Sequence, residues 1–343
     1  MSEPMGGREA LAAGFTRAIR DGRLGHAYLF RGPEGVGKRE FALRLVAALE
    51  CQRGDGTPCL TCDPCRAATL ERHPDLFVVG PEGARRVLPI ERIRRLVEEM
   101  SSRPWGGRGR TAILDPADRL TEEAANCLLA ILEAPPPGSL FLLVTARPEG
   151  VLPTIRSRAM DVFFGPLSPG EIEKRLGESG LSAERAREVA GLAEGSWHAA
   201  RRLADPGHWA AHEAFLDGLL SPRAGDVETA ATLVATLSGA EGEDSGVRAR
   251  VDEVLSELLA LARNALRALI QTPRPLPPLS PADRRHIAHL AALGVRGLAR
   301  LVRRTVELRD GLERSAALPL ALEAYAYDLR EMAGRAGLAA GGA

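Results

Sequence analysis

A glycine-rich segment, FRGPEGVGKRE at residues 30–40, holds the first residues whose types and spacing could do chemistry. It matches the G-x-x-x-x-G-K-[ST] phosphate-binding pattern up to its last position, through Gly32, Gly35, Gly37 and Lys38. The backbone N–H groups of such a loop cradle phosphates, and the lysine reaches the outer ones. The next position should offer a hydroxyl to Mg²⁺, but it holds Arg39, a cation that would repel the metal.

A second segment, ILDPADRL at residues 113–120, stands where an ATPase of this layout has an acidic pair after a strand. Asp115 fills the first acidic place, which would hold Mg²⁺ through water, but Pro116 fills the second, which would polarise the attacking water. Asp118 lies further along the chain and could not substitute without moving. Because this catalysis is nearly all metal placement and water positioning, the two losses predict no ATP hydrolysis. Two hypotheses about the loop stay open: residual nucleotide binding through Lys38, and a purely structural turn.

Four of the five cysteines follow the spacing C-x7-C-x2-C-x2-C, at Cys51, Cys59, Cys62 and Cys65. A tight knuckle plus one remote thiolate suits tetrahedral Zn²⁺, and the turn-rich QRGDGTP between them lets the chain fold back. All four ligand positions are filled, so we expect a closed, structural zinc site and not a catalytic one. The alternative is four reduced thiols on a mobile loop. Cys127 lies on the apolar face of AANCLLAIL and is expected in the core.

A third segment begins where an apolar strand ends at Thr145, near the place where a phosphate would sit. In an active relative, Thr145 could sense a γ-phosphate. A short helix, LPTIRSR, then presents Ser157 and Arg158. An arginine at the edge of an ATPase domain can act in trans on the active site of a neighbour. Taken alone, Arg158 is one of 45 basic residues, and the ordinary interpretation of such an arginine is a solvated surface charge.

Alternating strands and helices must position these residues. Apolar strands are predicted at 27–32, 75–79, 110–115, 139–146 and 159–165, and helices at 6–21, 38–50, 89–104 and 121–135. This alternation predicts a parallel α/β sheet with helices on both faces. Beyond it the pattern is helical, so the predicted domains are 1–167 with a cysteine module at 51–65, a small helical domain at 168–205, and an all-helical domain at 206–335. Residues 336–343 are predicted to be a disordered tail.

The composition limits the kind of protein. Lys+Arg and Asp+Glu are each 45, so a strongly basic nucleic-acid binder is disfavoured for the chain as a whole. No apolar run is long enough for a transmembrane helix, and the amino terminus lacks a secretory apolar core. We therefore expect a cytoplasmic protein with no membrane partner, in which the cysteines are thiols or metal ligands.

Several segments together resemble a known family: HAYLFRGPEGVGK, the four-cysteine module, HPDL, RTAILDPADRLTEEAANCLLAILEAPP and LPTIRSR. They are similar to the δ′ subunits of the bacterial DNA polymerase III clamp loader, which are AAA+ proteins. The resemblance covers about residues 24–167, and the helical remainder is similar to the collar domain but weakly specific. It implies a RecA-like AAA+ domain with a zinc module, a small helical lid and an all-α collar. Collars join clamp-loader subunits into a five-membered ring that opens the β sliding clamp and places it on primed DNA.

The resemblance also implies roles for residues. A δ′ subunit is a stator that contacts the γ/τ and δ subunits, and its Ser-Arg-Cys segment supplies an arginine finger to the neighbouring γ/τ ATP. Here that segment is Ser157-Arg158-Ala159, so the guanidinium is kept and the cysteine is not. The zinc ligands carry over to the four cysteines at 51, 59, 62 and 65. The motors carry a nucleotide-sensing arginine in a Gly-Ser-x-Arg lid motif, where this chain has His198, with Arg201 one helical turn away.

Two other functions remain as alternatives. One is an ATP-hydrolysing γ/τ-like motor, in which Asp118 or another acid replaces the missing carboxylate. The other is a zinc-dependent DNA-binding module, which the zero net charge and the three Trp, three Tyr and eight Phe disfavour, because few aromatic rings are available for base stacking. Decay at Arg39, Pro116 and His198 favours the non-hydrolysing subunit.

Overall fold

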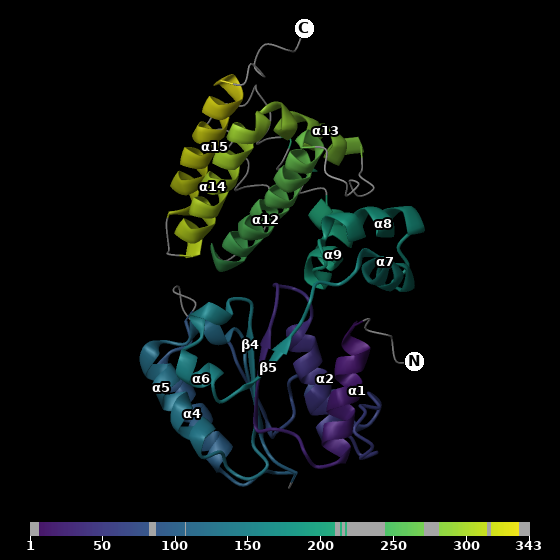
Figure 1. Cartoon of the computed structure of the whole chain (residues 1–343), viewed down its shortest axis with the longest axis vertical. Helices are drawn as coiled ribbons and strands as arrows, with labels where there is room; N and C mark the ends of the chain where they lie inside the picture. Colours follow the sequence, from purple (N-terminus) through teal and green to yellow (C-terminus); the bar gives the residue numbers. More distant parts are fainter. Residues whose placement is uncertain are drawn as a thin grey trace. The chain divides into compact units, whose positions relative to one another are not determined.

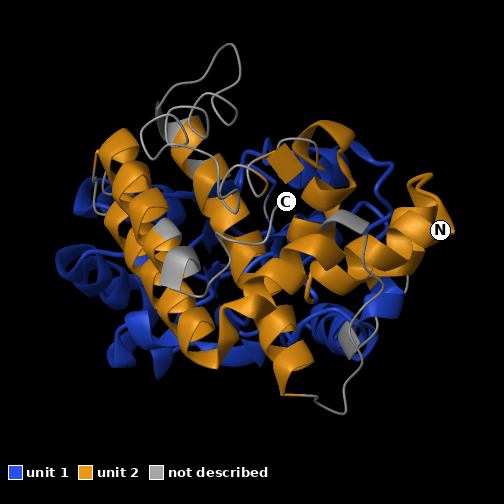
Figure 2. Ribbon diagram, turned by 90° about the horizontal axis from the view of Figure 1, so that it is seen from above, with its two compact units in different colours: residues 1–171, 195–198 blue, residues 172–194, 199–343 orange. Residues whose placement is uncertain are grey.

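The computed structural model of the chain describes residues 7–81, 87–106, 108–209, 213–214, 217, 244–270, 281–313 and 317–335. The chain divides into two compact units, residues 1–171 with 195–198 and residues 172–194 with 199–343 (Figure 2). The predicted tail at 336–343 lies outside the described residues.

The first unit is built on a sheet of five parallel strands. They are β1 (Ala27–Arg31), β2 (Leu76–Val79), β3 (Thr111–Leu114), β4 (Leu140–Thr145) and β5 (Met160–Phe163), in the order β2-β3-β4-β1-β5. Arg31 pairs with Thr145 on one side and with Phe163 on the other. The carboxyl ends of the strands therefore meet at one edge, which brings together the segments that follow β1, β3 and β4.

Helices cover both faces of this sheet, as predicted (Figure 1). They are α1 (Gly7–Arg20), α2 (Lys38–Glu50), α3 (Asp63–Thr69), α4 (Ile90–Ser101), α5 (Glu122–Glu133) and α6 (Pro153–Arg156), with short 3₁₀ turns η1 (Ala117–Arg119) and η2 (Pro148–Gly150). Side chains alternate along β1: Leu29 enters a core with α4 and α5, and Phe30 enters a core with α1 and α2. This alternation fixes which helix lies on which face.

The central strands β3 and β4 are buried along their whole length because both of their faces are covered. Every residue of β3 and β4 is buried, and Ile113 and Leu142 have no exposed surface. The edge strand β5 is mostly exposed, including Met160 and Phe163. The strand predicted at 159–165 is thus real but is an edge strand, and the helix predicted at 89–104 ends earlier, at Ser101.

The second unit is helical in its described residues, which confirms the predicted fold class. It contains most of α7 (Pro169–Glu178), α8 (Ala183–Leu192), the end of α9 (Trp197–Ala204), α12 (Asp244–Leu269), α13 (Pro281–Ala292), α14 (Gly294–Glu313) and α15 (Leu318–Arg335). Leu258, Leu301 and Leu322 are buried in its core. The boundary between 205 and 206 stays a prediction. Within the described part of the chain, no helix has the length and apolar character to cross a membrane.

Candidate functional site

The glycine loop connects β1 to α2 at the carboxyl edge of the sheet. Gly32 and Gly35 have φ of 148° and 72°, in the region that favours glycine. A Cβ on Gly32 would lie 2.0 Å from the carbonyl oxygen of Phe164, and one on Gly35 would lie 2.1 Å from Ser196 Oγ. Gly37, at φ 91°, directly precedes the first helical residue, Lys38. The loop has the strand–glycine loop–helix form of a phosphate site, and close packing requires its glycines.

The chain itself supplies partners for this loop. Lys38 is buried, and its Nζ donates to the carbonyl oxygens of Gly32 at 2.7 Å and Pro33 at 2.6 Å. The N–H of His198 donates to the carbonyl oxygen of Gly35 at 3.2 Å. The segment of residues 195–198 thus lies directly against the loop.

Arg39 makes the most informative contacts of the site. Its guanidinium forms paired hydrogen bonds to the Glu71 carboxylate, the shortest 2.8 Å, and an ion pair of 3.4 Å with Asp115. Burial raises the pKa of Asp115 above its ordinary value, and the charge of Arg39 opposes this rise. Burial lowers the pKa of Arg39, but its bonds to Glu71 and Asp115 outweigh this and raise it. Arg39 therefore places a positive charge beside the buried Asp115 carboxylate.

The side chains of Asp118 and Thr145 form a hydrogen bond with each other. The Thr145 hydroxyl at the end of β4 donates to Asp118 in η1 and accepts the N–H of Arg147 at 2.9 Å. Thr145 has no exposed surface. Asp118 would have to break this bond to act as a replacement for the carboxylate that Pro116 removes.

Arg158 lies just after α6 and just before the edge strand β5. Its guanidinium forms an ion pair of 2.5 Å with Glu133 at the end of α5, and it donates to the carbonyl oxygen of Thr154 at 3.0 Å. The side chain remains 37% exposed. The Arg158 guanidinium is thus partly exposed, is paired with the Glu133 carboxylate, and lies next to the edge strand β5.

The four predicted cysteine ligands come together between α2 and α3. Their sulfur atoms all lie within 4.8 Å of one another. Four sulfurs around one Zn²⁺ at the usual Zn–S distance of about 2.3 Å would be about 3.8 Å apart, and the Cys59 and Cys65 sulfurs are 3.9 Å apart. The set fits a tetrahedral metal ion after a small contraction.

Local structure prepares these sulfurs for a cation. Leu60, at φ 60°, turns the chain so that the N–H of Cys62 points at Cys59 Sγ, at 3.4 Å. Hydrogen bonds from Thr61 and Cys62 lower the pKa of Cys59 to about 5. Burial raises the pKa of Cys65 to about 12. Cys65 therefore needs a nearby positive charge to become a thiolate, which a divalent metal supplies.

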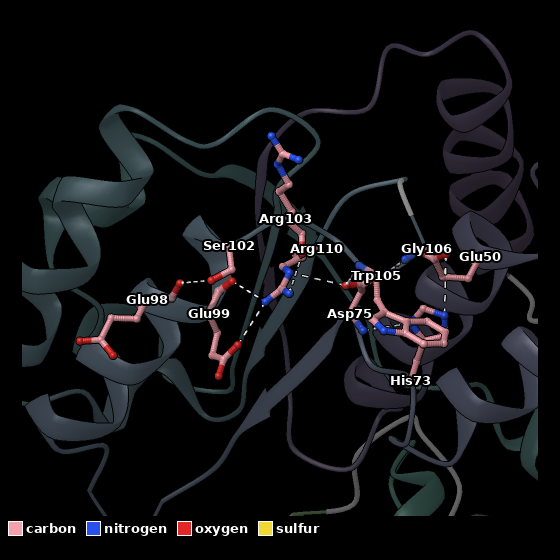
Figure 3. Close-up of polar contacts among 10 residues, drawn as sticks. All are labelled: Glu50, His73, Asp75, Glu98, Glu99, Ser102, Arg103, Trp105, Gly106 and Arg110. Atoms are coloured by element: carbon pink, nitrogen blue, oxygen red, sulfur yellow. Dashed lines mark hydrogen bonds and ion pairs between the residues drawn. The ribbon is translucent and has the colours of Figure 1, made fainter.

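Sequence reasoning missed the carboxylates that pair with the arginines. Glu71, in a loop at φ 58°, and Glu133 carry no motif signal, because only the folded chain brings them to Arg39 and Arg158. It also missed a buried polar network around Asp75 and Arg110 (Figure 3). The signal for that network was a charged residue directly before each of two apolar strands, β2 and β3.

A parallel α/β sheet with a glycine loop after its first strand is the arrangement of a nucleotide-binding type of fold. Residues 7–168 match the family described as "DNA polymerase III, delta subunit". These residues are similar to those of DNA polymerase III δ′ subunits.

Individual relatives agree with this assignment. The chain is 38% identical over 177 residues to the DNA polymerase III subunit delta' of Bacillus subtilis, covering 51% of this chain and 53% of that protein. It is 36% identical over 164 residues to DNA polymerase III subunit gamma/tau of Mycobacterium tuberculosis, covering 48% of this chain and 28% of that protein. The chain thus spans about half the length of the delta' relative and less than a third of the length of the gamma/tau relative.

A solved structure, a DNA polymerase III gamma subunit-related protein from Thermotoga maritima, is 19% identical with a TM-score of 0.43. It covers 94% of this chain and 99% of that one. A likeness this distant adds no argument about function.

Proposed function

We propose that this chain is the non-hydrolysing δ′-type subunit of a bacterial DNA polymerase III clamp loader. It acts in the cytoplasm as a stator beside γ/τ and δ subunits and helps to load the β sliding clamp onto primed DNA. The observation that carries the proposal is the contact of Arg39 with Asp115, 3.4 Å long and supported by Glu71. A cation covalently fixed at this carboxylate replaces the exchangeable metal on which ATP hydrolysis depends.

Arg158 acts in trans on the ATP of the neighbouring γ/τ subunit. Its ion pair with Glu133 is partly exposed on both sides, at 37% and 49%. Such pairs contribute only about 0–1 kcal/mol, so a triphosphate can displace Glu133 at small cost. Glu133 then serves to hold the guanidinium ready before the neighbour arrives.

The other parts have supporting roles in this proposal. The four cysteines bind one structural Zn²⁺, which crosslinks the end of α2 to α3. Residues 168–205 form the lid and 206–335 the collar that joins the ring. The carbonyl oxygens of the glycine loop already bind Lys38 and the N–H of His198, which favours a structural turn over a working nucleotide site.

Two measurements test the proposal. The purified chain alone should hydrolyse no ATP above background, and Lys38→Ala should change nothing; robust turnover that depends on Lys38 would contradict it. In the reconstituted ring, Arg158→Ala should lower hydrolysis at the neighbouring site by about 10³-fold. Arg156→Ala is the matched control, since Arg156 is exposed, two positions away, and has no polar partner for its side chain among the described residues. Equal activity of the two variants would reduce Arg158 to a surface charge.

A γ/τ-like motor remains the second candidate, because γ/τ proteins match the chain almost as well as δ′ proteins do. This function requires Asp118 to leave Thr145, and Arg39 to leave Asp115, when Mg-ATP binds. It predicts tight Mg-ATP binding by the isolated chain. The same ATPase measurement separates the two functions.

A further inference from the structure

The four cysteines of the cluster differ in how well solvent reaches them. Cys51 and Cys65 have no exposed surface, and both belong to the core that α2 covers. Cys59 and Cys62 are partly exposed, and the two residues between them are exposed. The cluster therefore has a buried pair, Cys51 and Cys65, and an outer pair, Cys59 and Cys62. A solute in water reaches the outer pair first.

Regular structure holds the buried pair in place. Cys51 is the residue at which α2 ends, and Cys65 lies inside α3, where its sulfur donates to the carbonyl oxygen of Ala47 at 3.2 Å. Ala68, one turn further along α3, is buried in the same core. Packing thus holds α3 against α2, and the buried sulfurs can move only with their helices.

The outer pair lies in a tight turn. Leu60, at φ 60°, reverses the chain between the two cysteines, and the N–H of Cys62 donates to Cys59 Sγ at 3.4 Å. The hydroxyl of Thr61 donates to the same sulfur, also at 3.4 Å. The sulfurs of the outer pair lie within 4.8 Å of each other. A small movement of this exposed turn therefore brings them to bonding distance.

We propose that Cys59 and Cys62 are a site of reversible oxidation, at which hydrogen peroxide joins the two sulfurs in a disulfide. Accessible sulfurs with a second sulfur close by are the ones that peroxides convert to disulfides. Transient disulfides of this kind are the usual form of redox sensing in the cytosol. The cysteine module is then a joint that responds to oxidants.

The reaction is balanced with one peroxide for each pair of thiols. The sulfur of Cys59 bonds to one peroxide oxygen, the O–O bond breaks, and the hydroxide that leaves takes a proton and becomes water. The sulfur of Cys62 then bonds to that of Cys59, the S–O bond breaks, and a second hydroxide leaves as water. The two thiols lose two electrons and two protons in total, and the peroxide gains them. An added thiol reverses the reaction by exchange.

Oxidation changes the module locally and leaves the sheet intact. It removes two of the four sulfurs that would hold Zn²⁺, and two remaining ligands are too few for a structural site. The link between the end of α2 and α3 through the metal is lost, but Cys65 and Ala68 stay packed in their core. This consequence rests on the structural zinc of the proposed function, whereas formation of the disulfide does not.

Cys127 is an internal control for simple exposure. It is also partly exposed, but it lies in α5 and packs against the core on the opposite face of the sheet from the cluster. If exposure alone decided the reaction, Cys127 would be oxidised as readily as Cys59. If a neighbouring sulfur is needed, Cys127 stays a thiol.

Treatment of the purified full-length chain with one equivalent of hydrogen peroxide tests the inference. Two of the five thiols should be lost, and peptide mapping by mass spectrometry should find Cys59 joined to Cys62. A chromogenic chelator should detect one Zn²⁺ released for each disulfide, and dithiothreitol with added Zn²⁺ should restore the starting state. Cys127→Ala should react in the same way. In Cys62→Ala, Cys59 should remain a sulfenic acid that dimedone labels.

Hydrogen exchange of the oxidised chain shows where the structure changes. Amides of residues 57–62 should exchange faster, and those of α2 should keep their rates. Retention of all five thiols would overturn the inference, as would a disulfide that joins any other pair or oxidation of Cys127 at an equal rate. Metal analysis before oxidation separates the two proposals: a disulfide between Cys59 and Cys62 in a chain without zinc would refute the zinc site alone, and zinc without this disulfide would refute the oxidation site alone.

Discussion

Replacing Asp75 with alanine should loosen the loop between α4 and β3 and destabilise the first unit. The buried side chain of Asp75 accepts the N–H of Trp105 at 2.8 Å and of Gly106 at 2.7 Å. Hydrogen bonds to a charged acceptor contribute about 1.5–3 kcal/mol each, so the two N–H bonds set an upper figure of about 6 kcal/mol. Water can reach these N–H groups once the carboxylate is gone, because Trp105 and Gly106 are exposed. Arg110 also keeps its bonds to Glu99 and Arg103. We therefore expect the free energy of unfolding to fall by about 3 kcal/mol. This is a large share of the free energy of unfolding of a typical protein, which is about 5–15 kcal/mol.

Urea unfolding of the full chain measures this loss, and hydrogen exchange locates it. The amides of Trp105 and Gly106 should exchange faster in Asp75→Ala, with intermediate rates in Asp75→Asn, whose amide oxygen can still accept one bond. Glu98→Ala is the control, since Glu98 is exposed on α4 and should change stability by less than about 0.5 kcal/mol. A loss below about 1 kcal/mol for Asp75→Ala, with unchanged exchange, would refute the idea that this carboxylate fastens the loop.

Three further results are expected. Purified protein should contain one Zn²⁺ per chain, and Cys62→Ser should lose it and unfold at lower temperature; a metal content well below one in the unaltered chain would argue against the site. Burial raises the pKa of Asp115 in the folded state, so its contribution to stability is fully present below the ordinary aspartate pKa and is lost as pH rises through the raised value. The unaltered chain should therefore gain stability relative to Asp115→Asn on acidification, and the opposite sign would exclude burial as the main cause. Gly35→Ala should lower the free energy of unfolding more than Gly54→Ala does. Both residues have positive φ, 72° and 66°, but a Cβ added at Gly35 would lie 2.1 Å from Ser196 Oγ, whereas a Cβ added at Gly54 would have no atom beyond its chain neighbours within 4 Å. Equal losses of unfolding free energy for the two variants, measured by urea unfolding, would mean that Ser196 moves away from the added Cβ at no cost in stability.

Much of the first unit could be predicted because its signals are local. The strands around Leu29 and Ile113 are short apolar runs between glycines, prolines and charged residues, and α2 begins at Lys38 as the loop pattern requires. The cysteine spacing predicted a cluster that the structure confirms. The order of the strands and the exposed edge at β5 were not predicted, since they depend on which faces the helices cover.

The amino-acid sequence by itself determined which groups are available and which are missing. It gives no hydroxyl after Lys38 and no second carboxylate after Asp115, and it supplies four cysteines at metal-binding spacing. Only the tertiary structure decided what fills the missing places. Arg39 meets Glu71, 32 residues away, and Asp115, 76 residues away, because the carboxyl edges of parallel strands bring distant segments together. The hydrogen bond from the N–H of Trp105 to Asp75 arises in the same way at the amino edge of the sheet. These two residues are 30 positions apart, and the pairing of β2 with β3 brings them together.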